Sequence, residues 1–140
     1  MSKLIDSFPH DAARDPQVKI LEFAENEFLH TDKKFLIIEA GTGVGKSAIG
    51  FAIARHLATT ALSNSYFLTT QKILQQQYVE DFSKLGMKSL KSSSNYQCTF
   101  DKSSSCSESS RQLRNAERGS RFWNNCMTRC PYKNAKTDFI

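Results

Sequence analysis

Residues 35–47 read Phe-Leu-Ile-Ile-Glu-Ala-Gly-Thr-Gly-Val-Gly-Lys-Ser, and this stretch decides the predicted fold. The short apolar run at 35–39 is typical of a strand buried on both faces, and a glycine-rich turn follows it. Hydrophobic periodicity predicts a helix over 47–59, a second strand over 66–70 and a further helix over 72–85. Because strands alternate with helices, we expect an α/β fold with a parallel sheet.

Three residues mark the expected ends of helices. Asp15 is a suitable N-cap for a helix that precedes the first strand, and Pro16 suits its first helical position. Gly86 is the expected C-terminal stop of the helix that begins near residue 72. The predicted element order is therefore helix, strand, helix, strand, helix.

Residues 40–47 have the composition of a phosphate-binding loop between a strand and a helix. Small residues let backbone N–H groups surround phosphate oxygens, and the helix N-terminus contributes the positive end of its dipole. We expect Lys46 to neutralise the β- and γ-phosphates and Ser47 to ligate Mg²⁺, which makes both catalytic candidates. Ala40 replaces a usual glycine and is tolerated there. The predicted loop contacts to ATP are Ala40, Gly41, Thr42, Gly43, Val44, Gly45, Lys46 and Ser47.

The loop could instead be a glycine-rich turn without a ligand, but the agreement of motif, strand and helix argues against that. Even so, kinases, transporters, GTPases and helicases all share the motif, so it does not name the reaction.

Charge is distributed unevenly along the 140 residues, whose net charge is +5. Residues 1–83 hold 8 basic and 10 acidic side chains, whereas residues 84–140 hold 11 basic and 4 acidic ones. A polyanion would therefore be attracted first to the second part. The length allows one domain, which is too little for the two nucleotide-clamping domains of a complete helicase motor.

The N-terminal residues 1–10 lack the apolar run of a signal peptide, and no segment approaches the length of a membrane span. We expect a soluble intracellular protein, cytoplasmic in a prokaryote or phage and nuclear in a eukaryote. In that setting four cysteines are more suited to a metal or cluster than to disulfides.

Serine dominates residues 89–110, and all four cysteines follow residue 88. We therefore predict two regions, 1–88 and 89–140, of which the second needs a bound metal to organise it. The candidate metal ligands are Cys98, Cys106, Cys126 and Cys130. Their spacing leaves a zinc ion and a 4Fe–4S cluster comparable, and four unconnected cysteines are a further alternative.

Four features in order resemble the XPD/DinG-type branch of the superfamily 2 helicases, and together they run from about Arg14 to Lys136. The first is an arginine–glutamine element ahead of the loop, and the second is the acidic residue that leads into the loop. The third is a threonine-rich strand end, and the fourth is the cysteine set, which closes with Cys-Pro-Tyr. These features are Arg14-Asp15-Pro16-Gln17, Glu39 to Ser47, Thr69-Thr70-Gln71, Asn95-Tyr96-Gln97-Cys98 and Cys126 to Tyr132.

The resemblance implies a partial RecA-like P-loop domain interrupted by a cysteine-rich, cluster-binding insert. It implies an ATP-dependent DNA helicase that moves 5′ to 3′, with ATP, Mg²⁺ and a 4Fe–4S cluster on the four cysteines. Gln17 would read the adenine edge, and Thr69 and Thr70 would contact the backbone of single-stranded DNA. The partner would be single-stranded or forked DNA, bound by a monomer. The alternatives are that Gln17 is a polar residue of a first helical turn and that Thr70 is a helix N-cap.

Two departures from this family's pattern are present. Ser93 and Ser94 occupy a stretch that usually carries a basic residue. No Asp-Glu-Ala-His box follows the cysteines, and the sequence ends at Ile140 before a second motor domain. We therefore expect a partial sequence, inactive as an ATPase in isolation because nothing completes Mg²⁺ binding or orients the attacking water.

Basic residues recur at helical spacing between Cys106 and Cys126, and we expect one helix face there to hold a DNA backbone. A solvated helix face is the alternative, and Trp123 is expected to pack near the cluster. The predicted DNA contacts in this stretch are Arg111, Arg114 and Arg118, with Arg121 on the same face.

Two other functions stay open at this point. One is a nucleotide- and nucleic-acid-binding module without unwinding activity. The other is a different P-loop enzyme, such as a small kinase, with a zinc-binding insert.

Overall fold

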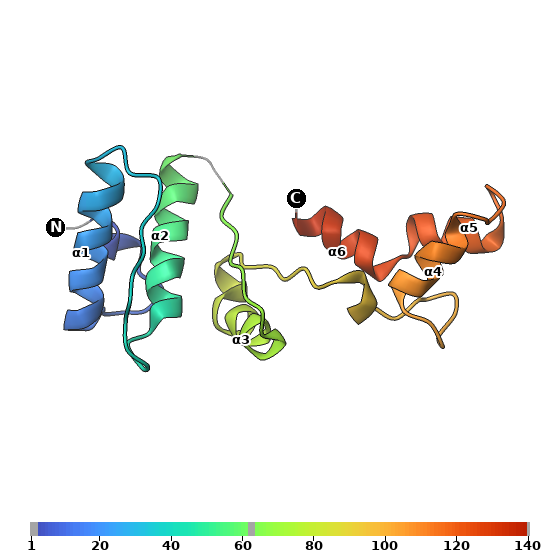
Figure 1. Ribbon diagram of the computed structural model, residues 1–140, viewed down its shortest axis with the longest axis horizontal. Helices are drawn as coiled ribbons and strands as arrows, with labels where there is room; N and C mark the ends of the chain where they lie inside the picture. Colours follow the sequence, from blue (N-terminus) through green and yellow to red (C-terminus); the bar gives the residue numbers. More distant parts are fainter. Residues whose placement is uncertain (1–2, 62–63, 140) are drawn as a thin grey trace. The chain divides into compact units, whose positions relative to one another are not determined.

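The computed structural model describes residues 3–61 and 64–139, and the chain divides into two compact units, Met1–Lys72 and Ile73–Ile140. Helices make up the regular structure of both units (Figure 1). The α-helices are α1 (Asp15–Leu29), α2 (Lys46–Thr60), α3 (Lys72–Phe82), α4 (Cys106–Leu113), α5 (Arg121–Thr128) and α6 (Pro131–Phe139). The short 3-10 turns are η1 (Ile5–Ser7), η2 (Ser83–Leu85) and η3 (Ser93–Asn95).

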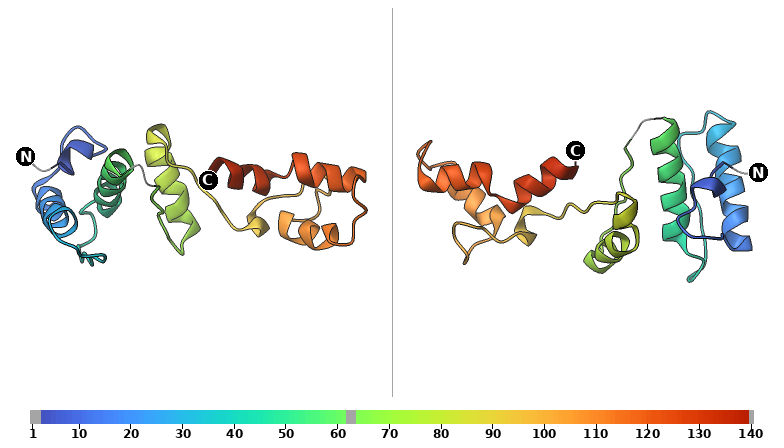
Figure 2. Two further views of the ribbon diagram at one scale, coloured as in Figure 1. Left: turned by 90° about the horizontal axis from the view of Figure 1, so that it is seen from above. Right: turned by 180° about the vertical axis from the view of Figure 1, so that it is seen from behind.

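In the first unit, α1 and α2 lie side by side and run in the same direction, with the segment between them returning alongside (Figures 1 and 2). Leu21 and Ala52 are fully buried where the helices meet, and Leu4 of the N-terminal segment closes the same cluster. A fully buried leucine contributes on the order of 2 kcal/mol. This small core holds the loop before α2 against the start of α1.

The predicted parallel sheet is wrong: across residues 3–61 and 64–139 there is no β-strand, only one isolated antiparallel bridge between Gln97 and Ser105. The segment 35–39 is extended, but only one of its faces packs. Leu36 lies against the helical core, whereas Phe35 is 88% exposed and Ile37 93% exposed. The expectation of burial on both faces therefore fails, and with it the α/β class.

The second predicted strand, 66–70, fails for the same reason. Phe67 packs on α2, with its ring centroid 6.5 Å from that of Phe51, whereas Leu68 is 92% exposed. An apolar run favours extended backbone and burial of one face, but a sheet also needs a neighbouring segment at hydrogen-bonding distance. Neither extended segment has one among the described residues.

The predicted helices are largely confirmed. The second helix begins at Lys46, one residue earlier than expected, and the third ends as α3 and a 3-10 turn. Gly86 caps that turn with φ +98°, the left-handed conformation that glycine adopts without strain, so the predicted stop is confirmed.

The predicted cap of the first helix is wrong by one residue. Arg14, not Asp15, is the N-cap of α1, and Asp15 is the first residue of the helix. The side-chain oxygen of Gln17 accepts the backbone N–H of Arg14 at 2.8 Å. Because that amide reaches back over one turn, it sets the start of the helix ahead of the aspartate.

In the second unit, α4 packs against α5 and against η3. Ser105 and Glu108 form a capping box at the start of α4, and the Ser120 hydroxyl accepts the Trp123 N–H at the start of α5. The predicted boundary near residue 88 lies inside this unit and stays a prediction about the 1–88 and 89–140 regions.

Candidate functional site: a glycine-rich loop and a cysteine-lined cavity

The loop at 40–47 leads directly into α2 and depends on two glycines with positive φ. Gly43 has φ +79°, and Gly45, the N-cap of α2, has φ +84°. Residues with a side chain rarely adopt this conformation, so glycine is required at both points. The resulting turn presents the N-terminal amides of α2 and the positive end of its dipole at the loop.

Lys46 is the first residue of α2, and its side chain folds over the loop. Its Nζ donates to the carbonyl oxygens of Ala40 at 2.9 Å and Gly41 at 3.0 Å. The side chain is exposed, so phosphate oxygens can replace these carbonyls without unfolding the helix. Ser47 follows in the first turn and is half-buried, beside the same loop.

Arg14 and Gln17 brace the loop from the start of α1. The Gln17 Nε2 donates to the carbonyl of Val44 at 2.9 Å. The Arg14 guanidinium donates to the carbonyls of Gly43 at 3.1 Å and Val44 at 3.3 Å. The sequence predicted that Gln17 binds the nucleotide, but it predicted no contact between Arg14 and the loop. The arginine–glutamine spacing was the signal that could have indicated that contact.

The Gln17 side chain is only 4% exposed, and two of its hydrogen-bonding positions are used inside the protein. An amide offers two N–H donors and two lone pairs on its oxygen. One N–H donor and one oxygen lone pair of the Gln17 amide therefore remain unused. An adenine edge requires one donor and one acceptor of this kind.

Thr69 and Thr70 end the second extended segment, just before α3. The Thr69 hydroxyl accepts the backbone N–H of Gln71 at 3.2 Å, and Thr70 is exposed. Since α3 begins at Lys72, Gln71 and not Thr70 directly precedes the first helical residue. The alternative role of Thr70 as a helix N-cap and DNA contact by these threonines both stay predictions.

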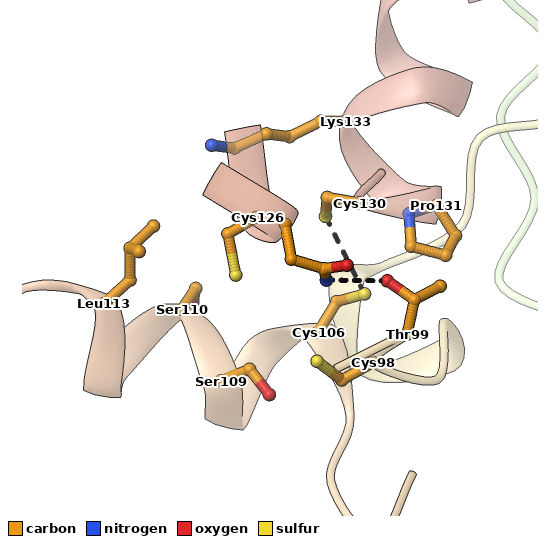
Figure 3. Close-up of a pocket in the computed structure, with 11 residues that line it drawn as sticks. Cys98, Thr99, Cys106, Ser109, Ser110, Leu113, Cys126, Cys130, Pro131 and Lys133 are labelled. Carbon is orange, nitrogen blue, oxygen red and sulfur yellow. Dashed lines mark hydrogen bonds between the residues drawn. The ribbon is translucent and has the colours of Figure 1, made fainter. Parts of the chain in front are cut away.

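The four cysteines come from separate parts of the second unit and border one cavity of about 30 Å³ (Figure 3). Cys98 lies in the loop before α4, Cys106 begins α4, Cys126 lies in α5 and Cys130 directly precedes α6. Cys98, Cys106 and Cys126 are buried, Cys130 is half-buried, and all four are free thiols. Segments up to 32 residues apart thus bring their sulfurs to a common space.

Hydrogen bonds hold the loop around Cys98 against α5. The Asn125 side chain donates to the Thr99 hydroxyl at 2.9 Å, and that hydroxyl donates to the Arg129 carbonyl at 3.2 Å. The rings of Tyr96 and Tyr132 pack with centroids 5.6 Å apart, which joins the same loop to α6. The loop around Cys98 is therefore held to the C-terminal half of α5 and to the start of α6.

The thiols differ in their pKa values. Burial acts to raise the pKa of Cys98, but hydrogen bonds from the Asp101 backbone, the Ser109 hydroxyl and the Phe100 backbone lower it below its usual value. Burial is the main cause that raises the pKa values of Cys106 and Cys126. Cys98 is thus the thiol of these three most easily converted to the thiolate that binds metals.

The donor set of four free thiols suits, by its chemistry, either a zinc ion or a four-iron cluster. The sulfurs of Cys106 and Cys130 are 3.8 Å apart, close to the spacing of about 3.8 Å that follows from tetrahedral zinc–sulfur bonds. Within the described residues, however, no three His, Cys, Asp or Glu side chains gather closely enough to hold one metal ion. A four-iron cluster binds each thiolate at a different iron, so its ligands need to border one cavity without meeting at one point.

The single arginine-bearing helix predicted between Cys106 and Cys126 is wrong. Arg111 lies in α4, Arg114 is its C-cap, Arg118 lies in the following turn and Arg121 begins α5. All four are exposed. Phe122, which follows Arg121 in α5, packs on Phe100 with ring centroids 5.2 Å apart.

Comparison with known protein families shows which family the chain belongs to. Residues 11–120 match the family described as type III restriction enzyme, res subunit. The chain belongs to this family. This family represents the N-terminal region of superfamily 2 helicases, so the chain carries a helicase-like ATPase module. No curated protein matches significantly, and neither does any solved structure.

Membership of the res-subunit family implies ATP and Mg²⁺ as cofactors and nucleic acid as a partner. The matched range includes the loop at 40–47, Cys98 and Cys106. No helix in the described part of the chain is long and apolar enough to cross a membrane.

Proposed function

We propose that this chain is the nucleotide- and DNA-binding front part of an ATP-dependent, XPD/DinG-like iron–sulfur helicase. In the intact motor, ATP hydrolysis would drive 5′ to 3′ movement along one strand and separation of the duplex. The helicase-like ATPase module follows from membership of the family. The assignment to the iron–sulfur branch is the part that this proposal adds.

ATP occupies the loop at 40–47 in this proposal. Lys46 exchanges the carbonyls of Ala40 and Gly41 for phosphate oxygens, which satisfies its charge better than neutral carbonyls do. Ser47 ligates Mg²⁺, and Gln17 offers its remaining donor and lone pair to adenine.

The observation that carries the iron–sulfur assignment is the convergence of four free cysteines on one cavity downstream of the loop. When bound there, a 4Fe–4S cluster would supply the cross-links that order a serine-rich segment with little apolar core. Cys98, Cys106, Cys126 and Cys130 would hold it. The two tyrosines and the Asn125–Thr99 bond would keep the ligand-bearing segments in register.

Single-stranded or forked DNA is the proposed partner. In this proposal Thr69 and Thr70 of the first unit donate hydroxyl hydrogen bonds to phosphate. Arg111, Arg114 and Arg118 form an exposed basic group in the second unit. These contacts neutralise backbone charge and read no sequence, which suits an enzyme that must move along any DNA.

The test is the metal and sulfide content of the chain after anaerobic purification, with its visible absorption spectrum. The proposal predicts about four irons and four acid-labile sulfides per chain and a broad brown absorption that fades in air. About one zinc without sulfide would contradict the iron–sulfur assignment. The matching binding assay is anisotropy of labelled forked DNA, with blunt duplex as the control.

A further inference from the structure

Ser109 lies in α4, one helical turn after Cys106, and its side chain is 2% exposed. Its Oγ forms no hydrogen bond of standard geometry with any residue that the structure describes, although it lies near enough to the Cys98 sulfur to lower the pKa of that thiol. A buried hydroxyl without a partner is unfavourable, because the hydrogen bonds it made to water are not replaced. Since buried polar groups are normally paired, the Cys98 sulfur is the acceptor that this hydroxyl calls for.

The neighbouring Ser110 shows how a serine in this helix satisfies itself. Its exposed hydroxyl donates to the Ser107 carbonyl at 2.8 Å, the usual bond of a helical serine to the preceding turn. Ser109 does not form the equivalent bond. Its oxygen points toward the sulfur of Cys98 (Figure 3).

Ser109 borders the same cavity as Cys98, Cys106 and Cys126. The Cys98 sulfur already accepts the backbone N–H of Asp101 at 3.4 Å. A sulfur that carries negative charge is a stronger acceptor than a neutral thiol, so metal binding would improve it as a partner for the hydroxyl.

We propose that Ser109 donates a hydrogen bond to the Cys98 thiolate in the cluster-loaded protein and thereby raises the reduction potential of the cluster. This inference rests on the proposed function, because it requires iron at the four cysteines. Reduction adds negative charge that spreads onto the sulfur ligands, so a donor at sulfur stabilises the reduced state more than the oxidised one. Ser109 acts through Cys98 and is a positioning residue, not a ligand.

The experiment compares the wild-type chain with Ser109→Ala and with the matched control Ser110→Ala, all purified anaerobically. Iron and sulfide content is measured first, and the midpoint potential is then measured by spectroscopic redox titration. We expect Ser109→Ala to keep its iron and to lower the reduced-to-oxidised ratio at a fixed potential about tenfold, which corresponds to about 59 mV for one electron. Ser110→Ala should leave the potential unchanged, because its hydroxyl already bonds to the backbone.

A second measurement separates this role from a structural one. In chelator-treated protein, Ser109→Ala should melt at the same temperature as wild type or higher, since it removes an unpaired buried hydroxyl. A clear fall in melting temperature there would overturn the inference.

The redox outcomes also separate the inference from the proposed function. An iron-loaded Ser109→Ala chain with an unchanged potential, or an equal shift in Ser110→Ala, would refute the inference and leave the cluster standing. A wild-type chain without iron would refute both.

Discussion

Gly45→Ala is the substitution for which the structure gives the clearest magnitude. A Cβ at this position would lie 2.5 Å from the Gln17 Nε2 and 3.2 Å from the Arg14 Nη2. The first distance is too short, so the buried Gln17 amide must move, whereas the exposed guanidinium of Arg14 can yield. The φ of +84° adds backbone strain for any residue other than glycine.

The two costs can be worked separately. The left-handed conformation costs an alanine about 1–2 kcal/mol. Displacing Gln17 breaks its bond to the Val44 carbonyl, which costs about 1–2 kcal/mol more when a buried group is left unpaired. We therefore expect Gly45→Ala to lower the free energy of unfolding by about 2–4 kcal/mol in total.

Gly43→Ala is the matched control, because Gly43 has φ +79° and a Cβ there would meet nothing within 4 Å. It should show the strain alone, about 1–2 kcal/mol. The assay is urea denaturation followed by circular dichroism, repeated in a Gln17→Ala background as a double-mutant cycle. In that background the two alanine variants should become equal. Equal destabilisation of the two in the wild-type background would refute the contact between Gln17 and Gly45.

Three further variants test the site. Arg14→Ala should weaken binding of a fluorescent ATP analogue several-fold, because the loop loses two hydrogen bonds from the Arg14 guanidinium to its carbonyls. The unfolding free energy should change little, since that side chain is exposed, and an unchanged affinity would show that Arg14 does not support the loop. Cys126→Ser should lose most bound iron, while Met127→Leu, an exposed neighbour, should retain it. Arg118→Glu should weaken binding of forked DNA, measured by anisotropy, and should reduce the dependence of the affinity on salt concentration. Arg55→Glu on α2 should have little effect; equal effects of the two variants would show that only the net charge matters.

The helices could be predicted because their signals are local. Pro16 fits the first turn of α1, Gly45 turns the chain into α2, and Gly86 ends the helical stretch after α3. Each signal acts within a few residues, through a fixed φ or a left-handed turn. The error of one residue at the start of α1 came from Gln17, whose amide caps the chain from inside the helix.

The sheet could not be predicted reliably because pairing is not a local property. The run at 35–39 has the composition of a buried strand, yet Ile37 is 93% exposed and its segment has no paired neighbour among the described residues. Apolar composition predicts extended backbone and does not identify a partner strand. The same limit applies to Leu68 in the second extended segment.

The candidate site was partly accessible from sequence. Lys46 and its loop followed from one compact motif, and the cysteine set followed from the four cysteines that all lie after residue 88. The bond between Gln17 and Val44 crosses 27 positions, so only the structure could show it. Ser109 had no distinguishing signal within a serine-rich stretch except its place one turn after Cys106.

The central claim is that the loop at 40–47 binds ATP through Lys46, and equilibrium titration of Mg-ATP by calorimetry tests it most directly. Because Lys46 is exposed, Lys46→Ala should leave the circular dichroism spectrum unchanged. A difference in Mg-ATP affinity between the two chains would then not come from a loss of folded structure. The account predicts saturable binding to the wild-type chain and a loss of at least about tenfold in Lys46→Ala, as expected for removal of a charged hydrogen bond. Equal affinities for the two chains, or no binding to the wild-type chain, would contradict it.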